Sequence, residues 1–183
     1  MLERDIFSFY MAMNPTDQSE LLFGAYNEDK FTGDINWHPV IDKLFWSLSL
    51  DDIKYNGVSI PFNSHSKKGL CDVKRCMVTP DSGTTLLTAP SWAIEAIKNA
   101  LPYEEDCKSD TQFANLTFVI DGVDYDLPSH HFMERYTNVF EEGDSICMTS
   151  ITDLDILQEG QKNLFIVGDT FMQIYYSIFD REQ

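Results

Sequence analysis

Residues 76–90 read CMVTPDSGTTLLTAP, in which an apolar strand runs into an Asp-Ser-Gly-Thr-Thr turn and leaves it through Leu-Leu. Gly83 lets the backbone turn tightly beneath the carboxylate of Asp81, because glycine has no Cβ. Neighbouring hydroxyl groups can hold that carboxylate, and the flanking apolar residues can anchor the turn in a core. The pattern is typical of a carboxylate fixed at a strand end. Asp-Ser-Gly is also a common turn tripeptide, however, and these five residues alone favour an ordinary turn.

A second apolar segment near the end of the chain changes this interpretation. Residues 164–171 read LFIVGDTF, and residues 175–181 read YYSIFDR. Together with the turn at 81–85 they resemble the C-terminal lobe of a pepsin-like aspartic endopeptidase. In that family a hydrophobic-hydrophobic-Gly strand passes the Asp-Thr/Ser-Gly loop, and Ile-Val-Gly at 166–168 is the match. Further matches, in the family's order, are 7–10 (FSFY), 23–24 (FG) and 32–40 (TGDINWHPV), so the resemblance covers nearly the whole chain.

The resemblance implies a mostly β fold, with residues 1–183 forming the C-terminal lobe of the bilobal pepsin-like fold and with two short helices. The sequence holds a single Asp-Thr/Ser-Gly, so the first catalytic aspartate of the family and its N-terminal lobe are missing. We therefore expect that lobe as a separate chain or segment. The resemblance also identifies peptides or proteins as the substrates.

Members of this family use two carboxylates that share one proton, because two such close like charges do not both ionise easily. The ionised carboxylate takes a proton from a bound water, and its protonated partner donates to the scissile carbonyl, without a metal ion or other cofactor. Asp81 resembles the second catalytic aspartate, and Gly83 the glycine whose backbone meets the substrate. Thr84 matches the hydroxyl that locks the two catalytic loops together, while Thr85 and Thr88 match cleft positions that touch substrate.

The four cysteines form a close pair and a distant pair, and an even count in an acidic domain indicates two disulfides and an oxidising compartment. The resemblance implies that Cys71 pairs with Cys76 and that Cys107 pairs with Cys147. Zinc is the alternative, because His65 lies shortly before Cys71 and thiolates bind zinc well. Against zinc, Cys-x4-Cys is looser than the usual finger spacing, and the chain has no second tight pair.

Composition excludes several classes of function. The 183 residues contain 13 Lys and Arg against 30 Asp and Glu, a net charge of −17, and 43% of them are hydrophobic. So acidic a chain repels phosphate, which argues against nucleic acids and anionic membrane surfaces as partners. No apolar run approaches the roughly 20 residues of a membrane-spanning helix.

Compartment is predicted from two further features. The first eleven residues lack a basic region and a small-residue cleavage site, so they are not a signal peptide, and we expect a fragment or a processed chain. Asn115-Leu-Thr is a candidate N-glycosylation site. With the cysteines, this predicts a secretory pathway, secretory organelle, acidic vesicle or extracellular location.

Apolar alternation predicts many short strands, with two-residue hairpin turns at Asn56-Gly57 and Asp121-Gly122. Two helices are expected, one at 91–101 with Ser91 as its N-cap and one at 128–133 that begins at a proline. The expected strands lie at 7–13, 21–26, 35–40, 45–50, 53–60 and 118–120, and a further strand begins at 123.

Other polar residues receive structural interpretations. The aspartates of 121–126 fail the EF-hand calcium pattern and fit a hairpin. His130 and His131 are adjacent on a short helix and point in different directions, so they do not readily share a metal ion. His38 is expected to be structural, and the carboxylates of 153–155 to be solvated.

Three departures from the family pattern qualify the resemblance: the single Asp-Thr/Ser-Gly, an end at residues 180–183 before the usual last strand, and Pro80 in place of an apolar residue with an N–H. The alternative functions are a catalytically inactive lobe that binds proteins and a homodimeric aspartic protease. Within the family, the Cys-x4-Cys spacing and the acidic loops resemble the plasmepsin branch and its IX/X type, whose members mature other secreted proteins.

Overall fold

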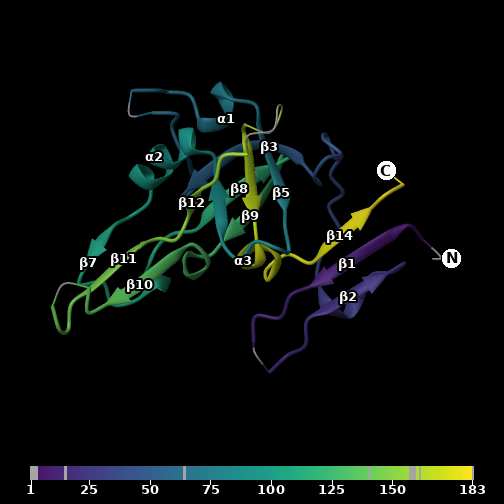
Figure 1. The fold of residues 1–183 in the computed structure, drawn as a ribbon, viewed down its shortest axis with the longest axis horizontal. Coiled ribbons are helices and arrows are strands. Elements are labelled where there is room, and N and C mark those ends of the chain that lie inside the picture. Colours follow the sequence, from purple (N-terminus) through teal and green to yellow (C-terminus); the bar gives the residue numbers. More distant parts are fainter. Residues whose placement is uncertain are drawn as a thin grey trace.

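The computed structural model describes residues 4–14, 16–63, 65–139, 141–156, 160 and 162–182. These residues form a mostly β structure, as predicted, in which short strands build three sheets (Figure 1). The expected second helix and one expected strand differ from the prediction, as described below.

The largest sheet has the strand order β12-β6-β13-β5-β3-β8-β9, and β4 also pairs with β3. At its centre β5 and β13 run parallel, with Met77 opposite Leu164 and Pro80 opposite Val167. All four residues of β13 are buried, as expected for a strand covered on both faces. The strands of this sheet are β3 (Leu48–Tyr55), β4 (Val58–Ser59), β5 (Cys76–Pro80), β6 (Leu87–Ala89), β8 (Leu116–Ile120), β9 (Val123–Leu127), β12 (Thr152–Asp153) and β13 (Leu164–Val167).

Both predicted hairpin turns are confirmed. Asn56 and Gly57, between β3 and β4, have φ of 51° and 73°. Asp121 and Gly122, between β8 and β9, have φ of 48° and 78°. Two successive positive φ angles match the twist of a tight hairpin, and Asn-Gly and Asp-Gly adopt them at low cost.

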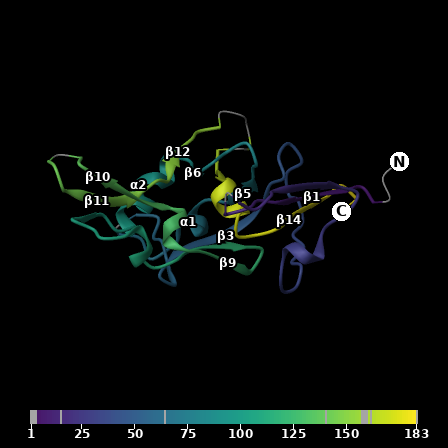
Figure 2. The ribbon, with the colours of Figure 1, turned by 90° about the horizontal axis from the view of Figure 1, so that it is seen from below.

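A second sheet joins the first and the last described strands, in the order β14-β1-β2. In Figures 1 and 2 it extends from one side of the largest sheet and carries both marked ends of the chain. The rings of Phe7 and Phe179 stack across it with their centroids 4.7 Å apart, and Trp46 packs on both. Its strands are β1 (Ile6–Tyr10), β2 (Glu20–Phe23) and β14 (Ser177–Asp180).

The third sheet lies at the opposite end of the molecule and has the order β10-β11-β7 (Figure 1). The disulfide between Cys107 and Cys147 ties the segment after β7 to β11. The strands are β7 (Glu104–Glu105), β10 (Met133–Thr137) and β11 (Ser145–Thr149).

The predicted helix at 91–101 is confirmed as α2 (Ser91–Ala100), which buries Ala93 and Ile97. Its N-cap is Pro90 and not Ser91, and the Ser91 N–H donates to Asp155 Oδ1 at 2.9 Å. The other helices that the structure describes are short: α1 (Leu70–Val73), α3 (Asp169–Met172) and the 3-10 turns η1 (Glu28–Lys30), η2 (Asp110–Gln112) and η3 (Ser129–His131).

Two predicted elements were wrong, and the two strands expected at 45–50 and 53–60 form instead a single strand, β3, which is followed by β4. The helix expected at 128–133 is reduced to the turn η3, because Met133 pairs with Thr149 and begins β10. No strand forms at 35–40, a segment in which Pro39 lacks an N–H and no neighbouring strand offers a ladder.

The core lies between the largest sheet and the elements packed on it, and it includes Leu50, Val78, Ile97, Phe132 and Phe165. It anchors the start of β5 and the length of β13, the two strands that lead to the turn at 81–85. None of the described helices combines the length and apolar character that crossing a bilayer requires.

Candidate active site

The turn at 81–85 begins where the ladder between β5 and β13 ends. The Asp81 N–H donates to the carbonyl of Val167 at 3.1 Å, so Asp81 is the first residue beyond β5 and is still tied to its neighbour. Pro80 does not interrupt the pairing of β3 with β5, because that pairing ends at Val78, two residues earlier. The strand therefore reaches Asp81 without needing the N–H that proline lacks.

Each carboxylate oxygen of Asp81 accepts a hydrogen bond from its own turn. The backbone N–H of Gly83 donates to Oδ1 at 2.9 Å, and the Thr84 hydroxyl donates to Oδ2 at 2.7 Å. A Cβ on residue 83 would lie 3.2 Å from Oδ1, so glycine allows the close approach. Asp81 stays partly exposed. The turn thus holds one carboxylate in a fixed orientation at the surface, as predicted.

The segment after β13 crosses directly over this turn. Asp169 N–H donates to the carbonyl of Thr84 at 2.8 Å, and Thr170 N–H donates to that of Thr85 at 3.2 Å. A Cβ at Gly168 would lie 2.6 Å from the carbonyl oxygen of Leu86 and closer still to that of Thr84. Glycine is therefore required at 168, which gives a physical reason for the Ile-Val-Gly pattern.

The other predicted contact positions lie along the same chain segment. Thr85 is exposed beside the turn, whereas Thr88 is half-buried on β6, opposite Ile166 of β13. The structure thus brings Asp81, Gly83, Thr84 and Thr85 together and places Thr88 one strand further along.

Both predicted disulfides are present: Cys71–Cys76 has a Cα–Cα distance of 5.2 Å, and Cys107–Cys147 one of 5.8 Å. The described residues leave no free cysteine, so the zinc alternative, which needs thiolates, was wrong. The first bridge ties α1 to the first residue of β5 and so anchors the strand that carries Asp81.

A sequence profile described as "Eukaryotic aspartyl protease" matches residues 1–183. The chain belongs to the eukaryotic aspartyl protease family. It is 32% identical over 190 residues to cathepsin E-A of Xenopus laevis, an alignment that covers 99% of this chain and 44% of the relative. It is 34% identical over 185 residues to cathepsin E of Cavia porcellus, covering 96% of this chain and 44% of the relative.

Embryonic pepsinogen of Gallus gallus is similar to the same extent, with 32% identity over 189 residues, 99% of this chain and 43% of the relative. The chain therefore spans somewhat less than half the length of these aspartyl protease relatives. The geometry of the turn at 81–85 is consistent with the family assignment of this chain.

Sequence reasoning gave no role to Asp169, the residue that follows Gly168 in this aspartyl protease chain. Its Oδ1 atom is buried and has no hydrogen-bond partner among the described residues, and the same holds for the hydroxyl of Thr170. Burial of the carboxyl, and then the negative charge of Asp81, raise the pKa of Asp169 above its ordinary value. The signal was present in the Gly-Asp pair, but its burial depends on the crossing of two segments.

We expect Asp169→Asn to raise stability at neutral pH. Because the folded-state pKa of Asp169 is raised, the folded protein holds this proton more tightly than the unfolded chain, and stability falls as pH rises through that pKa. Asparagine removes this loss. Melting temperatures from pH 3 to pH 7 should show the variant gaining on the wild type as pH increases, and a constant difference across that range would contradict the prediction.

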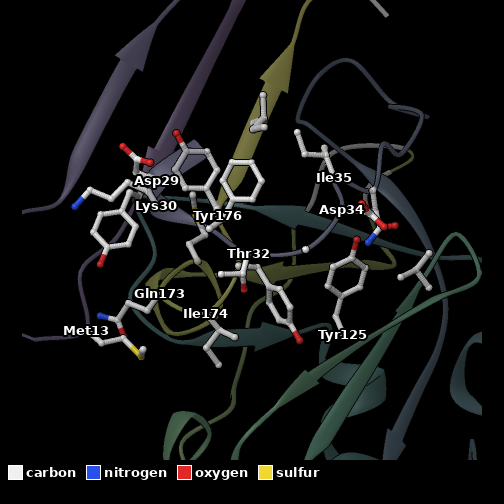
Figure 3. A pocket seen from close by; sticks show the side chains of 18 of the residues that line it. Met13, Asp29, Lys30, Thr32, Asp34, Ile35, Tyr125, Gln173, Ile174 and Tyr176 are labelled. Atoms are coloured by element: carbon white, nitrogen blue, oxygen red, sulfur yellow. The ribbon is translucent and has the colours of Figure 1, made fainter. Parts of the chain in front are cut away.

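Two cavities lie near the turn but not on Asp81. One, of about 800 Å³, opens between residues 29–37 and 172–176, with Tyr125, Gln173 and Ile174 in its wall (Figure 3). Another, of about 360 Å³, shares Tyr125 and reaches Pro80. Neither cavity is lined by Asp81 or by the other residues of the turn at 81–85.

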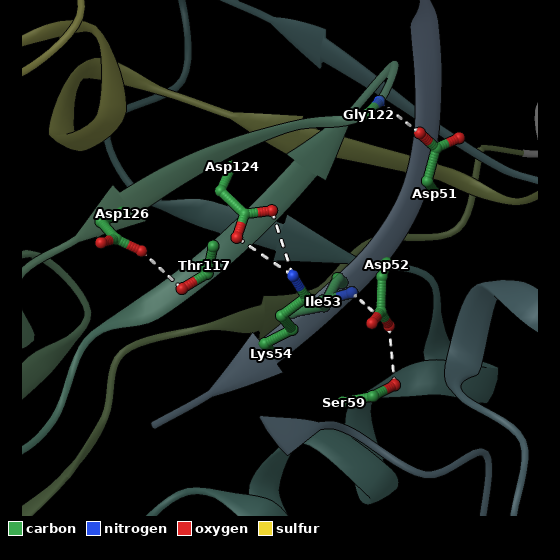
Figure 4. Close-up of polar contacts among 9 residues, drawn as sticks. All are labelled: Asp51, Asp52, Ile53, Lys54, Ser59, Thr117, Gly122, Asp124 and Asp126. Atoms are coloured by element: carbon green, nitrogen blue, oxygen red, sulfur yellow. Dashed lines mark hydrogen bonds and ion pairs between the residues drawn. The ribbon is translucent and has the colours of Figure 1, made fainter. Parts of the chain in front are cut away.

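The residues given structural interpretations behave accordingly. His38 contacts the Tyr125 hydroxyl at 2.6 Å. The hairpin aspartates have partners of their own, as Asp124 binds Lys54 and Asp126 accepts from Thr117 (Figure 4). His131 is buried and His130 exposed, but their rings lie side by side with centroids 4.2 Å apart, so the expectation that they point in different directions was wrong. Within the described residues, no three potential ligands gather into a metal site.

Proposed function

We propose that this chain is the C-terminal lobe of an aspartic endopeptidase and that Asp81 is one of its two catalytic carboxylates. The observation that carries the proposal is the support of Asp81, whose two oxygens accept from Gly83 N–H and Thr84 Oγ1 at 2.9 and 2.7 Å. A carboxylate held from both sides at a strand end costs little to reorganise during a reaction.

The second carboxylate comes from a companion lobe. The chain carries one Asp-Ser-Gly and covers 44% of relatives such as cathepsin E-A, which leaves room for such a lobe in the whole protein. Two facing carboxyl groups hold one proton between them. The ionised group takes a proton from water as its oxygen bonds to the peptide carbon, and the neutral group protonates the carbonyl oxygen. Collapse breaks the C–N bond and returns a proton to the leaving amine.

The neighbouring residues hold the substrate in this proposal. Gly83 offers backbone beside the reacting carbonyl, and the hydroxyl of Thr84 orients Asp81. Thr85 is exposed beside Asp81 and contacts the peptide directly, while Thr88 on β6 contributes from further along the cleft.

The test is native mass spectrometry of the purified whole protein, followed by denaturing mass measurement and a peptide-cleavage assay from pH 3 to pH 7. We expect cleavage, together with either a longer continuous chain or a companion chain that carries a second Asp-Thr/Ser-Gly. A lone, inactive 21.1 kDa species would overturn the proposal in favour of a binding lobe. An active dimer of this chain would replace it with a homodimeric protease.

Removing the Thr84 hydroxyl should reduce turnover. Thr84→Val leaves Asp81 Oδ2 without its donor, and a hydrogen bond to a charged group is worth enough to lower kcat by about ten- to a hundredfold. Thr84→Ser retains the hydroxyl and should restore most of the activity. Equal rates for the valine and serine variants in a peptide assay would contradict the role of the hydroxyl.

The finer proposals concern placement in the cell. The two disulfides support a secretory location, and the exposed side chain of Asn115 supports glycosylation there. The Cys-x4-Cys spacing supports the plasmepsin branch and a role in maturing secreted proteins. Intact mass before and after glycosidase treatment, with Asn115→Gln as the control, tests the modification: no mass change in the wild type would overturn it.

A further inference from the structure

Positive charge is concentrated in one short segment of this acidic chain. Residues 67–75 contain four of its 13 Lys and Arg residues and one carboxylate, a net charge of +3. The rest of the chain therefore carries −20. Like charges this close repel one another, and nearby carboxylates of the same chain could have offset that repulsion by forming ion pairs.

The segment that carries these cations reaches Trp92, the second residue of α2, and the backbone of one more basic residue, Lys162, contacts the same side chain. Lys74 Nζ lies 6.0 Å from the centre of the Trp92 ring, and the indole N–H donates to the carbonyl of Lys162 at 3.2 Å. On another side Phe62, whose N–H donates to the carbonyl of Lys68, has its ring 6.0 Å from that of Trp92. We call this surface the Trp92 patch; it comprises Trp92, Lys67, Lys68, Lys74, Arg75 and Lys162.

The cations of the Trp92 patch have no carboxylate partners within the part of the chain that the structure describes. The ion pairs found there involve Lys30, His38, Lys54 and Arg181 instead. The acid within the segment, Asp72, accepts from the backbone N–H of Gly69 at 2.9 Å and so supports the start of α1. All five basic side chains are exposed. Asp153 and Asp155 accept hydrogen bonds from Ser91, the neighbour of Trp92, and so border the patch on one side, while its basic side chains, unpaired among the described residues, are open to an external anion.

The patch lies at the far end of β5 from Asp81. Figure 1 shows α1 and α2 together at one end of the central strands and α3, beside the turn at 81–85, at the other. The five residues of β5 span about 16 Å. A ligand on the patch therefore leaves the turn uncovered, and the inference does not depend on the proposed function.

We propose that the Trp92 patch binds an acidic peptide segment of a partner protein. In physiological salt, screening limits electrostatic interactions to about 8 Å. A narrow peptide strand bound on the patch is therefore attracted by its cations and is repelled little by the negative surface further away. A lipid bilayer or a nucleic-acid duplex is wider, and it would also be repelled by the rest of the chain, which carries a net charge of −20. Lysine-rich cations on flexible stems suit carboxylates spaced along a peptide, and the half-buried Trp92 ring offers apolar contact between them.

The test is fluorescence anisotropy of a labelled ten-residue glutamate-rich peptide with the whole protein, against a glutamine-rich peptide of the same length. We expect the acidic peptide to bind and the neutral one not to bind. The double variant Lys68→Glu/Lys74→Glu should weaken binding by about tenfold or more, since it replaces two attractions with two repulsions. The control Lys43→Glu/Lys108→Glu makes the same charge change at exposed lysines outside the patch and should bind like the wild type.

Three results would overturn the proposal. These are equal weakening in the two double variants, no binding by the wild type, and preference for anionic vesicles or sulfated oligosaccharides over the peptide. Melting temperatures of both variants show whether they fold. If the patch variant does not, Lys68→Gln/Lys74→Gln replaces it, and an unchanged affinity in that variant would equally overturn the proposal.

Discussion

Asp81→Asn is expected to lower the rate of peptide-bond cleavage by at least about a thousandfold, the scale of a lost general acid or base. Asparagine has the shape of aspartate but does not titrate. Its amide oxygen can still accept from Gly83 N–H, and its amide N–H can donate to the Thr84 hydroxyl, so the turn keeps its contacts. Steady-state turnover of a peptide by the whole protein, with the melting temperature measured alongside, checks both halves of this expectation.

Asp106→Asn is the matched control for that experiment. Asp106 is exposed and follows β7 of the third sheet, away from the turn at 81–85. Its φ of 53° is positive, and asparagine tolerates such a conformation well. It should leave both turnover and melting temperature unchanged. If Asp81→Asn turns over substrate at the wild-type rate, Asp81 is not catalytic. If both variants lose activity, the cause is a general effect of the removed negative charge.

Gly168→Ala is expected to have the largest effect on stability. The added Cβ would press on the carbonyl oxygens of Thr84 and Leu86, and both are backbone atoms that no rotamer change can move. Forced overpacking of this kind costs about 3 kcal/mol or more, which corresponds to a fall of roughly 6–12 °C in Tm for a chain of this size. Chemical denaturation and calorimetry measure the loss, and turnover should fall with it.

Gly83→Ala separates the two roles of glycine at this site. Its Cβ would meet the carboxylate of Asp81 at 3.2 Å, a side-chain contact that can adjust, so stability should change little. Activity should still fall, because the adjustment moves Asp81. If Gly168→Ala melts at the wild-type temperature, the close crossing over the turn is not required for the fold.

Features set by local sequence could be predicted well. The hairpins at Asn56-Gly57 and Asp121-Gly122 depend on two residues each, and α2 depends on the spacing of its own apolar side chains. The disulfide pairing and the role of the turn at 81–85 required the resemblance to a family, because spacing alone left zinc and an ordinary turn open.

Features set by distant contacts could not be predicted. Met133 leaves the expected helix because it pairs with Thr149 of β11, sixteen residues further along the chain. The segment at 35–40 has an apolar pattern typical of a strand but finds no neighbour to pair with, and an isolated strand is not stable in water. The Oδ1 atom of Asp169 becomes buried only when the segment after β13 passes the turn, a crossing between segments more than eighty residues apart.

The pairing of β1 with β14 has a consequence for synthesis on the ribosome. Phe7 lies opposite Phe179, so the partner of one of the first strands is made about 170 residues later. At about 5–20 residues per second, β1 waits on the order of ten to thirty seconds with one edge unpaired and its phenylalanine rings without Phe179. Nascent chains at that stage present an open strand edge, which is a site for chaperone capture and for aggregation. Slower translation of the last residues would lengthen that exposure.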